Sequence, residues 1–255
     1  MGRRIVSIIE ETEGIELCGG TDLADGPFVG KDIGDVAGIG TKGIPIAADL
    51  ESILDECDVI IDFTEPGATL EHFIQASEAH KAIVIGTTGL DEERWKTFEA
   101  MAKTSRAVIA PNMSVGVNVL FKLAREAARI LGEDFDVEIV EMHHNKKEDS
   151  PSGTAVKLSQ IVADALGRDI SLVGKYGRYG QIGPRPKDEI GVMTLRGGDV
   201  VGDHTLIFAG PGERLELVHK AASRDNFARG AVRAAQWIVS QPLGIYDMQD
   251  VLGLK

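Results

Sequence analysis

Cysteine is scarce in this chain, which limits how the fold can be stabilised. Its 255 residues include only Cys18 and Cys57. Two thiols cannot form a disulfide framework, and their spacing matches no CxxC metal or redox motif. We therefore expect a reducing compartment, both thiols packed in the interior as small apolar groups, and no metal cofactor.

Long apolar runs are absent as well. The first apolar run, residues 5–9, is followed by acidic residues and is too short for the apolar core of a signal peptide. No run approaches the ~18 residues that a membrane-spanning helix needs. These absences predict a cytoplasmic protein without a membrane partner.

Basic residues are outnumbered, with 27 Lys and Arg against 40 Asp and Glu, for a formal charge of -13. This charge repels phosphate backbones and anionic lipids at long range, which argues against nucleic-acid and membrane partners. A site for an anionic ligand must then be a local concentration of cations and hydrogen-bond donors.

The first half of the chain alternates short, β-rich apolar runs with amphipathic helical patterns. The pattern predicts strands at residues 58–63, 82–86 and 107–111 and helices at 68–80 and 91–105. Continuous apolar strands between helices indicate an α/β fold, a Rossmann-like, doubly wound parallel sheet covered on both faces. The strands end in small or polar residues, at the edge where ligands bind in such sheets.

The second half predicts a different architecture. After a helix at 117–131, alternating strands are predicted at 137–143, 190–196, 200–208 and 214–221, with one clear helix at 154–166. This order is typical of a second α+β domain with a mixed or antiparallel sheet.

Glycines and prolines in residues 176–188 predict a long mobile loop. A final amphipathic helix at 226–241 is expected to pack back on the first domain. We therefore divide the chain into a dinucleotide-binding domain, residues 1–113 together with 226–255, and a substrate-binding and oligomerisation domain, residues 114–225.

The segment from Glu141 to Ala155 contains the most closely spaced residues that can bind an anion or exchange a proton. It places His143, His144 and Lys147 at a strand end, just before a Ser-Pro-Ser-Gly-Thr helix start. A helix N-terminus with cations beside it binds carboxylate or phosphate, and an imidazole with a pKa near ~6.5 can exchange protons. The alternative is a solvated basic turn with an ordinary serine cap.

Two weaker signals lie in the first half. Gly86-Thr87-Thr88-Gly89 follows an apolar strand and offers close backbone approach to a flat cofactor, with two hydroxyls as partners, although such turns are common. Asp22 follows residues 15–21, the predicted second strand, where an acid accepts hydrogen bonds from an adenosine ribose. The alternative for Asp22 is an ordinary exposed aspartate.

Six segments, in their joint order, resemble the dihydrodipicolinate reductase family over essentially the whole chain. They are Asp62-Phe63-Thr64, Gly86 to Gly89, Pro111 to Asn118, Glu141 to Lys147, Ser150 to Ala155, and His219 to Arg224. The combination of His-His-x-x-Lys with Ser-Gly-Thr-Ala is very specific to that family.

The resemblance implies a role for each matching residue. His143 matches the catalytic histidine, Lys147 the second proton donor, and His144, Gly153 and Thr154 the binders of the substrate's carboxylates. The stretches that line the cofactor correspond to Met1, Asp22, Gly86, Thr87, Thr88, Ala110, Pro111, Asn112 and Met113.

The family's reaction transfers a hydride from NADH or NADPH to a cyclic imine dicarboxylate in the diaminopimelate and lysine pathway, with loss of water from the hydroxylated substrate. The resemblance also implies a homotetramer built through the second domain's sheet.

We expect the protein to prefer NADH to NADPH. Asp22 repels the 2′-phosphate of NADPH, and Leu23 supplies no cation where some family members carry Arg. Lys31 and Lys42 lie in glycine-rich loop sequence and could approach the phosphate, so the preference should be partial.

One departure from the family pattern concerns the N-terminus. The family begins with an apolar strand and a Gly-x-x-Gly-x-Met-Gly loop that cradles the pyrophosphate, whereas this chain starts at Met1-Gly2, the counterpart of the final Met-Gly. We interpret Met1 as an internal methionine of the gene; the alternative is a product that does not bind the cofactor normally.

Two other functions each account for part of the sequence. A semialdehyde dehydrogenase would need a thiol nucleophile beside the nicotinamide, and both cysteines fall in early core segments. A truncated regulatory protein would keep the dicarboxylate site without transferring hydride.

Overall fold

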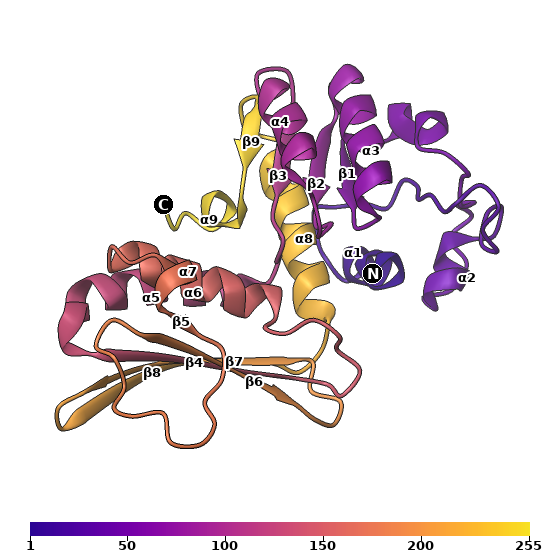
Figure 1. The fold of residues 1–255 in the computed structure, drawn as a ribbon. Coiled ribbons are helices and arrows are strands. Elements are labelled where there is room, and N and C mark those ends of the chain that lie inside the picture. The colour runs from indigo at the N-terminus through magenta and orange to yellow at the C-terminus, as the bar shows by residue number, and fades with distance from the viewer. The chain divides into compact units, whose positions relative to one another are not determined.

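A computed structural model describes all 255 residues and divides them into two compact units. The first unit combines both ends of the chain, Met1–Val115 and Asp225–Lys255, and the second is the continuous segment Gly116–Arg224. Figure 1 shows the elements of each unit.

The first unit is built on a four-stranded parallel sheet with the order β1-β2-β3-β9. Its strands are β1 (Val59–Asp62), β2 (Ala82–Ile85), β3 (Arg106–Ile109) and β9 (Gly244–Tyr246). Every residue of β2 is buried, as expected for a central parallel strand covered on both faces. Strand β9, only three residues long, was not predicted from the sequence.

Helices cover both faces of this sheet, which confirms the doubly wound architecture. On one face, Phe73 of α3 (Pro66–Glu78) and Phe98 of α4 (Glu92–Ala100) pack against Ile83 and its neighbours. On the other face, α8 (Asp225–Ile238) packs Ala231 and Ala235 against Val84, and α1 (Gly2–Glu10) packs beside α8. Shorter elements complete the unit: α2 (Ile33–Ala37), the 3₁₀ helix η1 (Glu51–Glu56) and α9 (Met248–Val251).

The prediction of a second strand at residues 15–21 was wrong. This segment is extended but unpaired except for one bridge, Thr21 to Ala47. An extended segment becomes a strand only where a neighbour satisfies its backbone groups. Strand β1 pairs only with β2, and a cavity of about 1250 Å³ is lined by both β1 and this segment.

Both cysteines line the same cavity. Cys18 is exposed and Cys57 is half-buried. The expectation that both thiols pack in the interior is therefore wrong for Cys18, because the segment that carries it lacks the neighbouring strand that would cover it.

The second unit contains a five-stranded mixed sheet with the order β5-β6-β4-β7-β8. Strand β4 (Asp136–His143) runs parallel to β6 (Ile190–Arg196) and antiparallel to β7 (Gly202–Gly210), which pairs with β8 (Glu213–Ala221). The two-residue β5 (Gly174–Lys175) completes the edge. The mixed sheet predicted from the sequence is thus confirmed.

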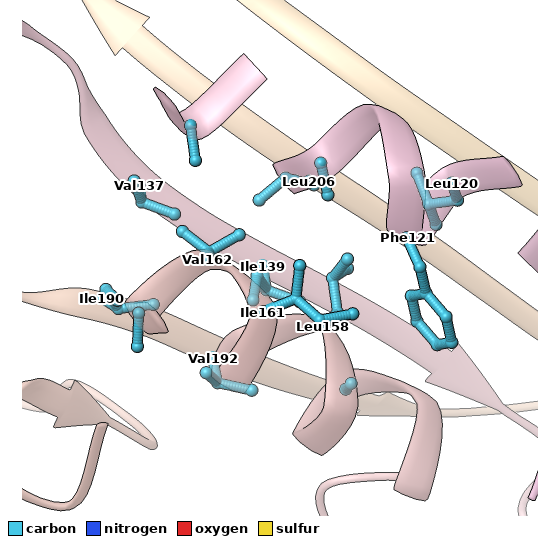
Figure 2. Packing of buried hydrophobic residues seen from close by; sticks show 14 of the residues in the cluster. Leu120, Phe121, Val137, Ile139, Leu158, Ile161, Val162, Ile190, Val192 and Leu206 are labelled. Carbon is cyan, nitrogen blue, oxygen red and sulfur yellow. The ribbon is translucent and has the colours of Figure 1, made fainter. Parts of the chain in front are cut away.

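Helices α5 (Val115–Leu131) and α6 (Gly153–Ala165) lie over one face of this sheet (Figure 1). Leu158 and Val162 of α6 pack against Ile139 of β4, with Ile190 and Leu206 from the flanking strands (Figure 2). A 3₁₀ turn, η2 (Gly132–Asp134), and a short helix, α7 (Ile170–Val173), accompany them. The sequence had predicted α6 as the one helix among these strands, and α7 adds a second.

Burial alternates along β4, which fixes where its polar residues point. Val137 and Ile139 face the core under the helices, and Glu141 and His143 continue the same row because side chains two residues apart share a face. The apolar row of this strand therefore ends in a buried polar pair.

The predicted loop at residues 176–188 has no regular secondary structure. Two arginines fasten it to β4: Arg178 donates to Glu138 at 2.6 Å, and Arg185 donates to the same carboxylate at 3.0 Å. No helix of the chain is both long enough and apolar enough to cross a membrane.

Candidate active site

The polar pair at the end of β4 is the centre of the candidate site. His143 Nδ1 lies 2.6 Å from Glu141 Oε2, and the carboxylate is fully buried. The His143 side chain retains 11% exposure. A buried carboxylate that holds one ring nitrogen leaves the other available for proton exchange.

Three further residues converge on Glu141. Arg196 donates from Nη1 at 2.8 Å and from Nη2 at 3.0 Å, the Ser152 backbone N–H donates at 3.0 Å, and the Thr194 hydroxyl donates at 3.3 Å. Burial by itself raises the pKa of Glu141, but hydrogen bonds from Arg196, His143 and Ser152 outweigh it and hold the pKa below its ordinary value. Glu141 is therefore an ion at neutral pH.

The start of α6 supplies the donors of an anion site. Ser152 caps the helix, its Oγ accepting from Ala155 N at 3.2 Å. Gly153 is exposed and Thr154 is half-buried. The backbone N–H groups of a first helical turn and the positive end of the helix dipole favour a carboxylate at such a terminus.

His144 and Lys147 lie in the turn after β4. The Lys147 backbone N–H donates to His144 O at 3.1 Å, and Lys147 Nζ donates to Asp149 at 2.7 Å. This hydrogen bond from Lys147 lowers the pKa of Asp149. The structure thus brings His143, His144, Lys147, Gly153 and Thr154 into one strand-turn-helix segment of the second unit.

Sequence reasoning missed His204, which lies on β7 opposite Glu141. Its ring meets that of His143 edge to face, with centroids 5.2 Å apart, and its Nε2 lies 3.1 Å from Ser152 Oγ. Burial, reinforced by the nearby His143, lowers the pKa of His204 to about 4. His204 is therefore a neutral hydrogen-bonding group near neutral pH.

Arg196 and Glu141 were also missed. Glu141 had a signal in the sequence, since it precedes His143 by two residues on a predicted strand and so shares its face. Arg196 and His204 had none, because the register of β6 and β7 against β4 cannot be deduced from residue spacing.

The pKa of His204 leads to a prediction about acid stability. Between about pH 6.5 and 4 the unfolded chain binds a proton here and the folded protein does not, so the free energy of unfolding falls as the pH falls, by up to about 3 kcal/mol. His204→Asn keeps a polar partner for Ser152 but does not titrate. We expect its urea-unfolding free energy to depend less on pH in this window.

The matched control is His80→Asn, at an exposed histidine of the other unit. This control should keep the pH dependence of the unsubstituted protein. An identical pH dependence in His204→Asn would show that His204 is protonated in the folded state and contradict the prediction.

In the first unit, the loop after β2 begins at a glycine for a steric reason. A Cβ on Gly86 would lie 2.3 Å from the Phe63 ring, and the Gly86 N–H donates to Asp62 O at 2.8 Å. Thr87 is buried and its hydroxyl lies 2.7 Å from that of Thr69 in α3, whereas Thr88 is exposed. Of the two hydroxyls, only that of Thr88 points to solvent, and Thr87 holds the loop.

The loop after β3 is tightly packed. Ala110 N donates to Ile85 O at 3.1 Å, and Asn112 Oδ1 accepts from Ser114 N at 2.9 Å. Met113 is buried against α8, where a Cβ on Gly230 would lie 1.7 Å from Met113 O. Pro111 is exposed, so this loop presents its first residues at the carboxyl edge of the sheet.

Asp22 and Met1 line the same cavity, about 1250 Å³ in volume, together with Thr64. Asp22 Oδ1 accepts from Leu23 N at 2.9 Å, and Leu23 is 73% exposed. The two lysines that could approach this position are engaged elsewhere. Lys42 pairs with Glu10 at 2.5 Å and Lys31 lies over the Phe28 ring.

The first unit is doubly wound and has polar loops at its strand ends. The second unit has a mixed sheet with a buried carboxylate–imidazole pair at a helix start. Together these features define a two-unit α/β protein of the kind found among nicotinamide-dependent dehydrogenases. The family model for the N-terminus of dihydrodipicolinate reductase matches residues 1–113, and the model for its C-terminus matches residues 116–252. The chain belongs to the dihydrodipicolinate reductase family.

Individual relatives agree with this assignment. The 4-hydroxy-tetrahydrodipicolinate reductases of Syntrophobacter fumaroxidans and Citrifermentans bemidjiense are 53% and 52% identical, over 100% of this chain and 96% of each relative. A dipicolinate-bound dihydrodipicolinate reductase from Paenisporosarcina sp. TG-14 superposes with a TM-score of 0.75 at 27% identity, covering 98% of this chain and 94% of that one. An amine dehydrogenase from Mycobacterium smegmatis, at 14% identity and a TM-score of 0.56, shares the fold.

Proposed function

We propose that this protein is a 4-hydroxy-tetrahydrodipicolinate reductase, which reduces a cyclic imine dicarboxylate to tetrahydrodipicolinate in lysine biosynthesis through diaminopimelate. The observation that carries the proposal is the ionised Glu141 beside His143 at the start of α6, in a chain 53% identical to reductases of that name. NADH or NADPH, when bound, supplies the hydride.

The residues of the second unit bind the substrate and supply the proton. The N–H groups at the start of α6, with Gly153, Thr154 and His144, bind the carboxylates of the substrate. His143 and Lys147 supply the proton that accompanies the hydride. This cluster of donors and cations is the local site that a chain of charge -13 requires for an anionic substrate.

The first unit contains groups that suit a dinucleotide. Asp22 and Met1 open into a cavity of about 1250 Å³, and the exposed Thr88 follows a glycine that permits close backbone approach. We assign the cofactor to these residues and to Gly86, Thr87 and the loop from Ala110 to Met113. Asp22 binds the adenosine ribose, and the two loops bind the nicotinamide half.

The decisive experiment is a coupled assay in which dihydrodipicolinate synthase generates the substrate and NADH oxidation is followed at 340 nm. It is run on this chain and on a version extended through any in-frame codons upstream of Met1. Substrate-dependent oxidation supports the proposal. Binding of 2,6-pyridinedicarboxylate without turnover in either version would favour a regulatory dicarboxylate-binding protein.

We further propose a cytoplasmic homotetramer assembled through the second unit's sheet. Helices cover one face of that sheet, while on the other face Leu195 and Val218 are 49% and 50% exposed. Exposed apolar side chains on an uncovered sheet face favour association. Light scattering coupled to size exclusion tests this, with a mass of one or two chains as the contradicting result.

Dipicolinate, the planar 2,6-pyridinedicarboxylate seen in the Paenisporosarcina structure, should inhibit competitively against the substrate. Thr154→Val removes one hydroxyl at the start of α6 and keeps the helix N-terminus. Losing a hydrogen bond to a charged partner costs about 1.5 to 3 kcal/mol, which is roughly a 10- to 150-fold rise in Kd. Titration calorimetry measures the change.

A matched control is Thr104→Val, at an exposed threonine of the other unit, which should leave the Kd unchanged. Equal affinity in Thr154→Val and the unsubstituted protein would reject Thr154 as a ligand.

Cofactor preference should follow Asp22 and Leu23. The Asp22 carboxylate repels a 2′-phosphate, and Lys42 and Lys31 are engaged with Glu10 and the Phe28 ring, so we expect a lower KM for NADH than for NADPH. Leu23→Arg offers a guanidinium to the phosphate and should shift the ratio of kcat/KM toward NADPH.

The control for charge alone is Leu243→Arg, the same change at a 52% exposed leucine of the same unit that does not line the cavity. It should leave the preference unchanged. Steady-state kinetics that show NADPH favoured tenfold or more in the unsubstituted protein would contradict this role for Asp22 and Leu23.

A further inference from the structure

The carboxylate of Glu141 has both oxygens occupied by donors in a fully buried position. We propose that Glu141 is a positioning residue that fixes the tautomer of His143 and ties that ring to the start of α6. The role of His143 as a proton donor rests on the proposed function. The tautomer of His143 and its link to α6 rest on the contacts of Glu141.

The tautomer follows from which groups can donate. An ionised carboxylate only accepts, so at 2.6 Å the proton of this contact belongs to His143 Nδ1. The neutral ring then carries its lone pair on Nε2. A Cβ at position 202 would lie 3.0 Å from Nε2, and Gly202 keeps that side of the ring uncovered. Nε2 is therefore the atom that exchanges a proton with a ligand.

The two oxygens of the Glu141 carboxylate hold different parts of the site. Oε2 accepts from His143 Nδ1 and Arg196 Nη1, and Oε1 accepts from Ser152 N, Arg196 Nη2 and, at 3.3 Å, Thr194 Oγ1. Since Ser152 is the cap of α6, one rigid group holds both the proton-exchanging ring and the helix start that binds the carboxylates. Arg196 neutralises the buried charge and fixes its plane.

Glu141→Gln tests this arrangement because it replaces one carboxylate oxygen with NH₂. Wherever the amide nitrogen points, it meets a donor: His143 and Arg196 on one side, or Ser152 and Arg196 on the other. If it faces His143, the ring must turn to the Nε2–H tautomer to accept the hydrogen bond. If it faces Ser152, the helix start loses its acceptor.

The same strand offers a matched control. Glu138 lies on the opposite face of β4 and is also paired with two arginines, Arg178 and Arg185, at 2.6 and 3.0 Å. Glu138→Gln therefore repeats the loss of an arginine-paired charge on β4 without touching His143.

The test is ¹⁵N NMR of the whole protein with ring-labelled histidine, the His143 signals being assigned by their loss in His143→Gln. We expect the Nδ1–H tautomer in the unsubstituted protein at a pH where the ring is neutral. Glu138→Gln should keep this tautomer, and Glu141→Gln should show the Nε2–H form or a mixture. An Nε2–H tautomer in the unsubstituted protein overturns the proposal even if Glu141→Gln fails to fold.

Kinetics and binding supply the second readout. Groups that orient a metal-bound histidine typically contribute about 10- to 100-fold to activity. By the same logic, Glu141→Gln should lower kcat by about tenfold or more, while Glu138→Gln stays within about twofold of the unsubstituted protein. The Kd for 2,6-pyridinedicarboxylate should rise in Glu141→Gln, by less than kcat falls.

The NMR arm needs no turnover, so an inactive protein with the Nδ1–H tautomer rejects the proposed function and leaves the positioning by Glu141 standing. Equal kcat in both glutamine variants, or a Glu141→Gln protein in which both the tautomer and the Kd for 2,6-pyridinedicarboxylate are unchanged, overturns the positioning role.

Discussion

Replacing His143 with glutamine should lower kcat about 10²- to 10⁴-fold, the usual contribution of a positioned general acid. Glutamine is close to histidine in size and can still donate to Glu141, so the buried carboxylate keeps a partner at this position. What the variant loses is a group that can give up a proton near neutral pH. Initial rates in the coupled assay measure the loss.

Two measurements distinguish the loss of proton transfer from a general effect of the substitution and from a loss of folding. His80→Gln makes the same change at an exposed histidine and should retain full activity. Circular dichroism and the thermal midpoint of His143→Gln should stay close to those of the unsubstituted protein, because the side chain ends a strand and does not fill the apolar core. Activity within a few-fold of the unsubstituted protein would remove His143 from the mechanism.

Lys147→Ala should have an effect of similar size, about 10²- to 10⁴-fold on kcat, if Lys147 is the second proton donor. Lys147 lies in the turn directly after β4, and its ammonium donates to Asp149 at 2.7 Å. Only 20% of its side chain is exposed. The adjacent Lys146 is exposed and provides a matched control, since Lys146→Ala removes an equal charge one residue away.

Lys147→Arg separates charge from proton transfer. Arginine keeps the positive charge but does not give up a proton at neutral pH, so the variant should bind 2,6-pyridinedicarboxylate nearly normally and still turn over slowly. A variant Lys147→Arg with normal kcat would show that the residue contributes charge alone. Equal losses in Lys146→Ala and Lys147→Ala would show that the turn as a whole, and not Lys147, is required.

The geometry also explains how an acidic protein can bind a dianionic substrate. The buried negative charge of Glu141 is matched by Arg196, and Lys147 by Asp149, so the charges of the site are paired before any ligand arrives. The start of α6 adds backbone N–H groups and the positive end of the helix dipole, whose effect is confined to the first turn. Recognition of the substrate's carboxylates then depends on short-range hydrogen bonds, which the net charge of the chain hardly alters.

The local elements and their order along the chain follow from the residue pattern without any tertiary contact. Hydrophobic periodicity located β1 to β3, β4 and β6 to β8 and the helices between them, because burial of a strand or a helix face imposes its period on the residues. The strand-turn-helix segment from Glu141 to Thr154 was visible for the same reason, since its chemistry is contiguous in the chain.

Pairing was decided only by the tertiary structure. Residues 15–21 have the composition of a strand, yet apart from the bridge from Thr21 to Ala47 they remain unpaired beside a cavity, because hydrogen bonding to a neighbour, and not composition, makes a strand. The three-residue β9 is the converse case, too short to show a period and formed because β3 offers it an edge.

The same reason separates the residues of the site that were found from those that were missed. His143 and Lys147 are close in sequence, whereas Arg196 and His204 reach the site from other strands, 53 and 61 positions after His143, through the register of β6 and β7 against β4. A shift of one residue in either register would turn these side chains to the opposite face of the sheet. Register is set by the packing of the whole unit, so no local pattern could have placed them beside Glu141.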